Sequence, residues 1–214
     1  MHATVRFFTL VALLLLLAHE SAARMFLLRG PIVVIESAED LAAVAAPSKA
    51  ALHARQLVHD NEWTTMATLS VQFKGVPWGN VVSYSDGIGD SAEASTGELF
   101  FYLTNLDATG ADLAVNPSAS IAISLAQQGR SKCKMDVEDP TCWKLTMSGK
   151  VVPVPKEKEA FAKKALFSKH PQMESWPSDH GFQAYMLEIE NIVLLDFYGG
   201  AKHIPVDEYF GVKL

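Results

Sequence analysis

Alternating apolar and polar positions dominate the chain between residues 65 and 198. Such alternation is typical of β-strands that bury one face, because successive side chains point to opposite sides of a strand. Six runs show it, and they cover residues 65–71, 80–85, 98–104, 120–127, 143–151 and 184–198. The pattern is clearest in 143–151, where Trp143, Leu145 and Met147 are predicted to point inward. In the first run, Ala67 and Leu69 lie on one side, and polar or sulfur-containing residues lie on the other. In the run 98–104, apolar residues fall on both sides, so both faces of this strand are expected to be covered.

Three helices are predicted around these strands, each next to a proline that limits its extent. They cover residues 48–59, 107–116 and 156–169. The third helix carries an apolar stripe of Phe161, Ala162, Ala165 and Leu166. Six strands with short connections favour a closed antiparallel barrel, because closure removes the exposed sheet edges. The predicted fold class is therefore mainly β, a six-stranded antiparallel barrel with peripheral α-helices.

The N-terminus has the organisation of a secretory signal peptide over residues 1–23. Arg6 provides a positive charge, an apolar run follows, and the small residues Ser21 and Ala23 precede a cleavage site. The run is too short to span a bilayer, which takes about 20 apolar residues. We therefore expect cleavage after Ala23, an N-terminal extension over residues 24–46 and a folded domain over residues 47–214. The mature protein is expected not to insert into a membrane.

The composition indicates a folded protein that does not bind nucleic acid. Of the 214 residues 49% are hydrophobic, and 18 Lys and Arg against 24 Asp and Glu give a net charge of −6. This apolar fraction supplies a hydrophobic core, which excludes a disordered chain. Nucleic-acid binding depends on clustered Lys and Arg side chains, and a chain with a pI near 5.6 lacks that signature.

The two cysteines, Cys133 and Cys142, are separated by the segment KMDVEDPT. In the oxidising compartment that the signal peptide implies, an even number of cysteines favours a disulfide. A metal site would need more ligands, and no histidine lies nearby in the sequence. A redox-active pair would have Cys-x-x-Cys spacing. We predict a Cys133–Cys142 disulfide and no metal site.

Motifs for catalysis are missing from the sequence. It contains neither the Gly-x-Ser-x-Gly elbow of serine hydrolases nor a phosphate-binding P-loop, and its seven histidines form no metal-binding pair. Asp179 and His180 are adjacent, but the polarity of their loop explains both as surface residues. The segment 167–180 is rich in proline and aromatic residues. We expect it to cover the end of the barrel, with ligand contact as the alternative, and assign no catalytic residue.

Several segments resemble the flavin-binding split-barrel superfamily, which includes pyridoxamine-phosphate oxidase. They are residues 65–70, 75–83, 85–87, 100–104 and 113–117. Three further segments resemble the CREG family, named after a cellular repressor of genes stimulated by an adenoviral oncoprotein, and general split-barrel enzymes lack them. They are residues 165–171, 176–178 and 197–202. The resemblance spans about residues 51–210. It implies a secreted or endolysosomal homodimer with the FMN-binding split-barrel fold and no demonstrated need for flavin.

Charge provides an independent test of flavin binding. Split-barrel flavin oxidases hold the FMN phosphate with Arg and Lys side chains, and one such position corresponds to Asn80. Others fall in residues 106–110, where this chain carries Asp107. The 55 residues between Lys74 and Arg130 contain no Lys or Arg and six acidic residues. We therefore expect no cofactor. If the ancestral flavin groove is used, the resemblance assigns it to Asn80, Val81, Thr104, Asp107 and Thr109.

The resemblance and the missing cations predict a non-enzymatic protein that acts as a homodimer through protein–protein contacts. Its partner is expected to be an unidentified receptor or secretory-pathway protein. The location is extracellular, with the endolysosomal or vacuolar lumen as the alternative. The chain has no N-glycosylation sequon, because Asn116 is followed by Pro117. The alternative function is an FMN- or haem-dependent oxidoreductase, with His170, His180 or His203 as the candidate axial haem ligands.

Overall fold

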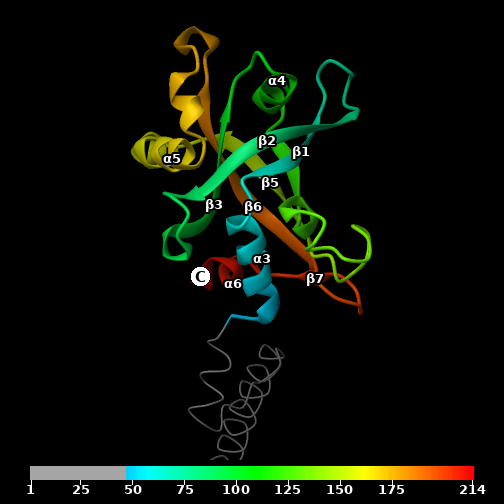
Figure 1. Ribbon diagram of the computed structural model, residues 1–214. Helices are drawn as coiled ribbons and strands as arrows, with labels where there is room; N and C mark the ends of the chain where they lie inside the picture. Colours follow the sequence, from blue (N-terminus) through cyan, green and yellow to red (C-terminus); the bar gives the residue numbers. More distant parts are fainter. Residues whose placement is uncertain (1–46) are drawn as a thin grey trace, which may run out of the picture. The chain divides into compact units, whose positions relative to one another are not determined.

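A computed structural model describes residues 47–214 (Figure 1). The predicted signal peptide, residues 1–23, and the N-terminal extension, residues 24–46, lie outside the described residues. Within the described part, seven strands form one sheet. They are β1 (Trp63–Leu69), β2 (Pro77–Gly87), β3 (Ser95–Leu103), β4 (Ser118–Ser124), β5 (Lys144–Pro153), β6 (Gln183–Leu195) and β7 (Lys202–His203).

Six of these strands close into a barrel. The sheet order is β3-β2-β1-β4-β5-β6-β7, every pairing is antiparallel, and β3 also pairs with β6. The closing pair aligns Phe100 with Met186 and Phe101 with Tyr185. The predicted six-stranded antiparallel barrel is therefore confirmed. The two-residue strand β7, which the alternation pattern did not reveal, is added at the edge of β6.

The helices lie around the barrel. They are α3 (Lys49–His59), α4 (Ala108–Val115), α5 (Lys156–Lys169) and α6 (Val206–Gly211). Figure 1 shows α5 beside β2 and β3, and α3 next to α6 near the C-terminus. Ser48 begins α3 by accepting a hydrogen bond from the amide of Ala51. Across residues 47–214, none of the helices has the length and apolar character of a membrane-spanning segment.

The hydrophobic core lies on both faces of β3, as the sequence of this strand predicted. Phe101 packs inside the barrel with Met147 and other residues of the larger core cluster. Phe100 points to the other side, into a second cluster that contains Ala165 and Leu166 of α5. Burial of both faces explains why residues 99–103, the second half of β3, are all apolar.

Strand β1 buries the face that carries Thr64 and Thr68, not the face that carries Leu69. Thr64, Met66 and Thr68 are buried, whereas Leu69 is 42% exposed. The Thr68 hydroxyl donates a hydrogen bond to the Asp112 carboxylate at 2.7 Å, so its burial leaves no unsatisfied polar atom. As a result, the outer surface of the sheet is partly apolar.

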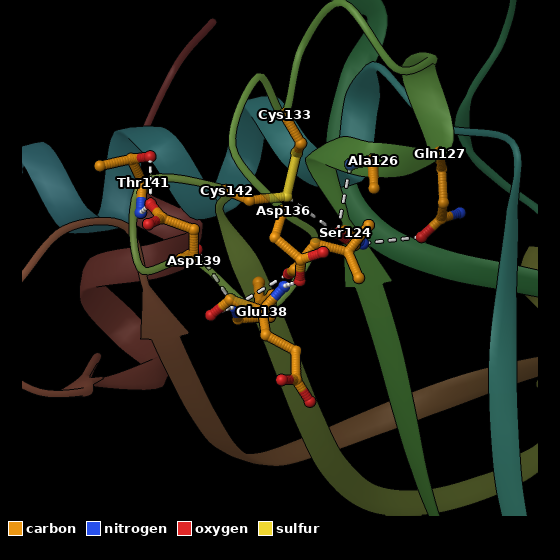
Figure 2. The surroundings of a disulfide bond; sticks show 11 residues. Ser124, Ala126, Gln127, Cys133, Asp136, Glu138, Asp139, Thr141 and Cys142 are labelled. Carbon is orange, nitrogen blue, oxygen red and sulfur yellow. Dashed lines mark hydrogen bonds between the residues drawn. A yellow bond between two sulfur atoms is a disulfide. The ribbon is translucent and has the colours of Figure 1, made fainter.

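The predicted disulfide between Cys133 and Cys142 is present and closes the loop before β5 (Figure 2). The two Cα atoms are 5.0 Å apart. Ser124 opens the short helix η2 (Leu125–Gln128) with a capping box, and its hydroxyl lies 3.7 Å from the Cys142 sulfur. Within the loop, the Asp139 carboxylate accepts a hydrogen bond from the Thr141 amide at 2.9 Å. The disulfide therefore fixes a loop that has few apolar anchors of its own.

Candidate functional site

A groove of about 350 Å³ lies between β2, β3 and the segment containing the short helices η3 (Pro171–Ser175) and η4 (Ser178–His180). This volume is at the lower end of the range for small-molecule sites, about 300–1,000 Å³. The lining comprises Asn80, Val81, Val82, Ser83, Tyr102, Leu103, Thr104, Asp107, Met173, Trp176 and Phe182. Four of the five residues assigned to the ancestral flavin groove, Asn80, Val81, Thr104 and Asp107, are in this lining.

The fifth assigned residue, Thr109, joins the others through a hydrogen-bond network. The Asn80 side-chain amide donates to Asp107 Oδ2 at 3.0 Å and to the Thr109 hydroxyl at 2.9 Å. The Thr109 backbone amide donates to the same Asp107 oxygen at 3.1 Å, which makes Asp107 the N-cap of α4. The five residues therefore lie together, but their polar atoms largely satisfy one another.

The end of β3 holds this network close to the η3–η4 segment. The Thr104 hydroxyl accepts a hydrogen bond from the Leu106 amide and donates one to the His180 carbonyl oxygen. Helix α4 packs directly on this turn, and a Cβ atom at Gly110 would clash with the Thr104 carbonyl oxygen. Glycine is therefore required where the helix approaches the strand.

Aromatic rings cover one side of the groove. The Tyr102 ring centroid lies 5.3 Å from Phe182 and 6.0 Å from Trp176, and both pairs are stacked. The ring centroids of Trp176 and Phe182 are 4.6 Å apart, and Met173 of η3 is buried. The proline-rich segment thus packs on the barrel as expected, while Trp176 retains 36% exposure at the groove.

Among the candidate haem ligands, only His180 lies beside the groove. Its ring centroid is 6.3 Å from that of Phe182. His170 is buried, with its Nε2 atom 2.9 Å from the Tyr84 carbonyl oxygen, so that nitrogen already has a partner. His203 belongs to β7, pairs with Val193 of β6 and is not among the lining residues. The fold therefore separates the three candidate histidines.

The groove does not provide the donors that an FMN phosphate requires. Within the described chain no Lys or Arg lines it, and Asp107 is its charged residue. A helix N-terminus can bind a phosphate, but the N-terminus of α4 is already capped by the Asp107 carboxylate. A phosphate placed here would meet a negative charge instead of charge-assisted donors. The residues present do not fit FMN.

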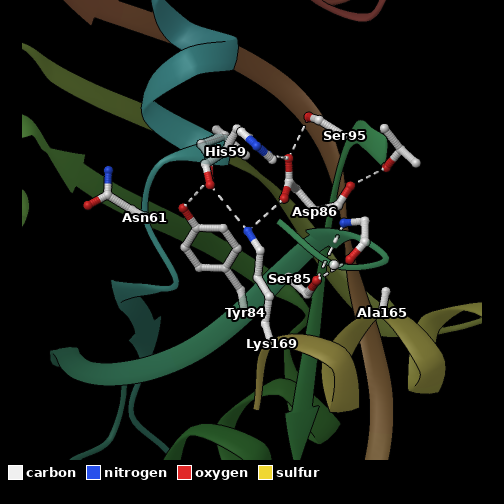
Figure 3. Close-up of polar contacts among 12 residues, drawn as sticks. His59, Asn61, Tyr84, Ser85, Asp86, Ser95, Ala165 and Lys169 are labelled. Atoms are coloured by element: carbon white, nitrogen blue, oxygen red, sulfur yellow. Dashed lines mark hydrogen bonds and ion pairs between the residues drawn. The ribbon is translucent and has the colours of Figure 1, made fainter. Parts of the chain in front are cut away.

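A second polar cluster surrounds Asp86 inside the molecule (Figure 3). Lys169 Nζ lies 2.9 Å from one carboxylate oxygen, and the other oxygen accepts a hydrogen bond from Ser95 and lies 3.2 Å from His59 Nδ1. Burial raises the pKa of Asp86, but the Ser95 hydrogen bond and the Lys169 charge outweigh it and lower the pKa below its usual value. The sequence showed only a turn at Asp86 and a helix end at Lys169.

Arg55 extends this cluster to the C-terminal segment. Its side chain is 1% exposed and donates to the Ser95 carbonyl and hydroxyl oxygens, each at 3.0 Å, and to the Val212 carbonyl oxygen at 2.9 Å. The Tyr209 hydroxyl donates to the Gly97 carbonyl oxygen, and burial raises the pKa of Tyr209 well above its usual value. These contacts connect α3, β3 and α6, and they indicate a structural role for the cluster.

A third cluster centres on Asp196, which follows β6. The His53 Nδ1 atom lies 2.8 Å from Asp196 Oδ2, and Lys202 Nζ lies 2.6 Å from Asp196 Oδ1. The His53 ring stacks on Trp143 at 3.8 Å. The segments that resemble the CREG family thus supply Lys169 and Lys202, each as the cationic partner of a buried carboxylate.

A closed six-stranded antiparallel barrel with this groove defines a protein of the split-barrel class. The fold is similar to that of a heme-binding protein from Mycobacterium smegmatis, with a TM-score of 0.62 and 20% identity over 76% of this chain and 60% of that one. It is also similar to the protein Atu2129 of unknown function from Agrobacterium tumefaciens, with a TM-score of 0.55 and 17% identity over 78% of this chain and 61% of that one. Identities this low show a shared fold.

Within this class, the chain belongs to the CREG family. Residues 45–211 match the family model described as CREG, beta-barrel. Protein CREG1 of Gallus gallus is 40% identical over 173 residues, which cover 79% of this chain and 90% of the relative. Protein CREG2 of Mus musculus is 40% identical over 160 residues, which cover 73% of this chain and 54% of the relative. The predicted family is thereby confirmed.

Proposed function

We propose that this chain is a secreted or endolysosomal, non-enzymatic protein that acts as a homodimer through contacts with a receptor or another secretory-pathway protein. One observation is the main support for a non-enzymatic role. The position expected for a flavin phosphate is taken by the network of Asn80, Asp107 and Thr109, which lacks any cation. Without a cofactor, the groove has little chemistry of its own, since redox reactions of this fold depend on the bound group.

The titratable groups of the groove support the same conclusion. No His, Cys or Lys is among the described lining residues, and the Asp107 carboxylate is engaged as a helix cap. General acid–base or nucleophilic catalysis needs a group that can reach a reacting atom in the correct protonation state. The fold relative from Mycobacterium smegmatis is described as heme-binding, and His180 lies beside the groove. Haem is therefore included in the test below.

An outward sheet face favours the homodimer. Thr65 of β1 pairs with Val81 of β2 and with Ala122 of β4, and all three side chains point out of the barrel. Ala67 of β1 is also exposed, and Val81 is 62% exposed. We call Thr65, Ala67 and Ala122 the small-residue face. An uncharged surface of this kind suits a two-fold interface that buries the same patch on both subunits.

The test uses the mature protein purified from a secreting cell. Its visible absorbance is recorded before and after addition of FMN or haem, and its mass is measured by light scattering. We expect a colourless dimer that takes up neither compound. A stoichiometric flavin or haem band would contradict the non-enzymatic role, and a monomer at micromolar concentration would contradict the homodimer. N-terminal sequencing of the secreted product is expected to begin at Arg24.

A further inference from the structure

We propose that the groove between β2, β3 and the η3–η4 segment binds the guanidinium group of an arginine side chain from a partner protein. This assignment rests on the proposed function and names the chemistry of its contact. It follows from the finding that the charge of the groove does not suit an anionic ligand. The groove contains a carboxylate and an aromatic wall. The carboxylate repels a phosphate, and the two features together recognise a planar cation.

The charge of the groove is the first argument. Its lining comes from two stretches without Lys or Arg, residues 75–129 and residues 170–201. Glu174 and Asp179 flank Trp176 in the second stretch, and both are exposed. Among the described residues, the charged residue of the groove lining is Asp107, and its charge is negative. A negative surface attracts a cationic partner and repels anionic ones.

The Asp107 carboxylate supplies a fixed acceptor. Its Oδ2 atom accepts hydrogen bonds from the Asn80 side chain and the Thr109 amide, which hold the carboxylate in place. The Oδ1 atom has no donor among the described residues. A carboxylate can accept more hydrogen bonds than these two, so Asp107 can receive N–H groups of a guanidinium while it still caps α4.

The aromatic wall adds selectivity for a planar cation. Trp176 lines the groove with more than a third of its surface exposed, and Tyr102 and Phe182 support it from within. Tryptophan is the best aromatic partner for a cation, and guanidinium groups stack on aromatic rings better than ammonium groups do. A cavity of about 350 Å³ accommodates one long side chain with its neighbours. Arginine fits these requirements better than lysine.

The direct test is calorimetric titration of the mature dimer with N-acetyl-arginine amide. N-acetyl-lysine amide and N-acetyl-glutamate serve as the ammonium and anionic comparators. We expect saturable binding of the arginine compound, at least about threefold weaker binding of the lysine compound, and no binding of the glutamate compound. No saturable binding of the arginine compound, or equal binding of all three compounds, would overturn the proposal.

Two substitutions locate the site. Asp107→Asn removes the charge but keeps a residue that caps helices equally well, and it should weaken arginine binding about tenfold. Asp90→Asn removes an exposed charge outside the groove lining, and it should leave binding unchanged. Trp176→Leu should weaken binding about threefold, with melting temperature recorded to confirm folding. Equal affinity of Asp107→Asn and the parent protein would contradict the assignment.

Failure of this assignment and failure of the proposed function give different results. A colourless dimer that takes up neither FMN nor haem and does not bind the arginine compound would remove the guanidinium site and leave the proposed function intact. Stoichiometric uptake of FMN or haem would remove both, because the groove would then be a cofactor site.

Discussion

The Lys169 ammonium lies 2.9 Å from the Asp86 carboxylate, although the two residues are 83 positions apart in the sequence. Both side chains are almost completely buried, at 5% and 0% exposure. The pair joins the last residue of α5 to strand β2, and Ser95 of β3 donates a second hydrogen bond to the same carboxylate. One ion pair therefore connects a helix and two strands inside the fold.

Loss of the Lys169 charge is expected to destabilise the fold strongly. Lys169→Met leaves the Asp86 carboxylate buried without its cation, and removal of one partner of a buried ion pair costs about 3–5 kcal/mol. The matched control is Lys163→Met, which removes an exposed pair with Glu159 and should cost at most about 0.5 kcal/mol. Urea unfolding followed by circular dichroism measures both values. Equal losses in the two variants would show that the buried pair has no special role.

The stability contribution of Asp196 is expected to persist at endolysosomal pH and to disappear in stronger acid. Burial raises the pKa of Asp196, but hydrogen bonds from Lys202 and His53 outweigh it and lower the pKa. A carboxyl group with a lowered folded pKa stabilises the fold above its unfolded pKa, about 3.9. It loses that contribution as the pH falls through the folded value.

The comparison is therefore made between the parent protein and Asp196→Asn. The parent should be more stable at pH 5, and the difference in unfolding free energy should shrink as the pH falls from about 5 to about 3. Denaturant unfolding at several pH values measures this difference. A difference that grows on acidification would contradict the assigned direction of the pKa shift.

The disulfide is expected to stabilise the protein moderately. Cys133 and Cys142 close a short loop, and the loop-entropy relation gives roughly 2–3 kcal/mol for a loop of this length. The double variant Cys133→Ser, Cys142→Ser should lose about this amount in urea unfolding, and the parent protein should lose the same amount after reduction. In the variant, amide hydrogen exchange should accelerate in residues 129–142 and not in the groove. Faster exchange at both places would indicate that the disulfide has a wider structural role.

The small-residue face is expected to form the dimer interface. Ala67→Glu places a charge on this face, and a two-fold interface formed by the face would bury two such charges of the same sign. Light scattering should show a monomer whose circular dichroism spectrum matches that of the parent protein, because the side chain at this position is exposed and the fold of the subunit does not depend on it. The control is Val137→Glu, an exposed position in the disulfide loop that should leave the dimer intact. A dimeric Ala67→Glu variant would place the interface elsewhere.

Features that depend on local patterns were predictable from the sequence. The alternation in β5 predicted that Leu145 and Met147 point inward, and both are buried. The doubly apolar sequence of β3 predicted two covered faces, and the structure shows two clusters that meet at this strand. These predictions succeeded because the side-chain period of a strand and the burial of its apolar face are set by neighbouring residues.

The buried face of β1 was not predictable in this way. Its apolar residue Leu69 is exposed, and its hydroxyl residues Thr64 and Thr68 are buried, because Ala122 and Asp112 provide their hydrogen-bond acceptors. Those acceptors come from β4 and α4, more than 40 residues away in the sequence. A buried hydroxyl is stable only where a hydrogen-bond partner is available. A local sequence pattern does not reveal a partner that comes from a distant part of the chain.

The barrel strands, the disulfide and the lack of phosphate-binding cations could be inferred from the amino-acid order alone, because these follow from residue types and short-range order. Which distant residues meet is set by the folded chain. It placed Asn80, Asp107 and Thr109 in one network, and it paired Asp86 with Lys169 in the interior. A buried charge or polar group is stable only with a partner, and here folding brings that partner from a distant part of the chain.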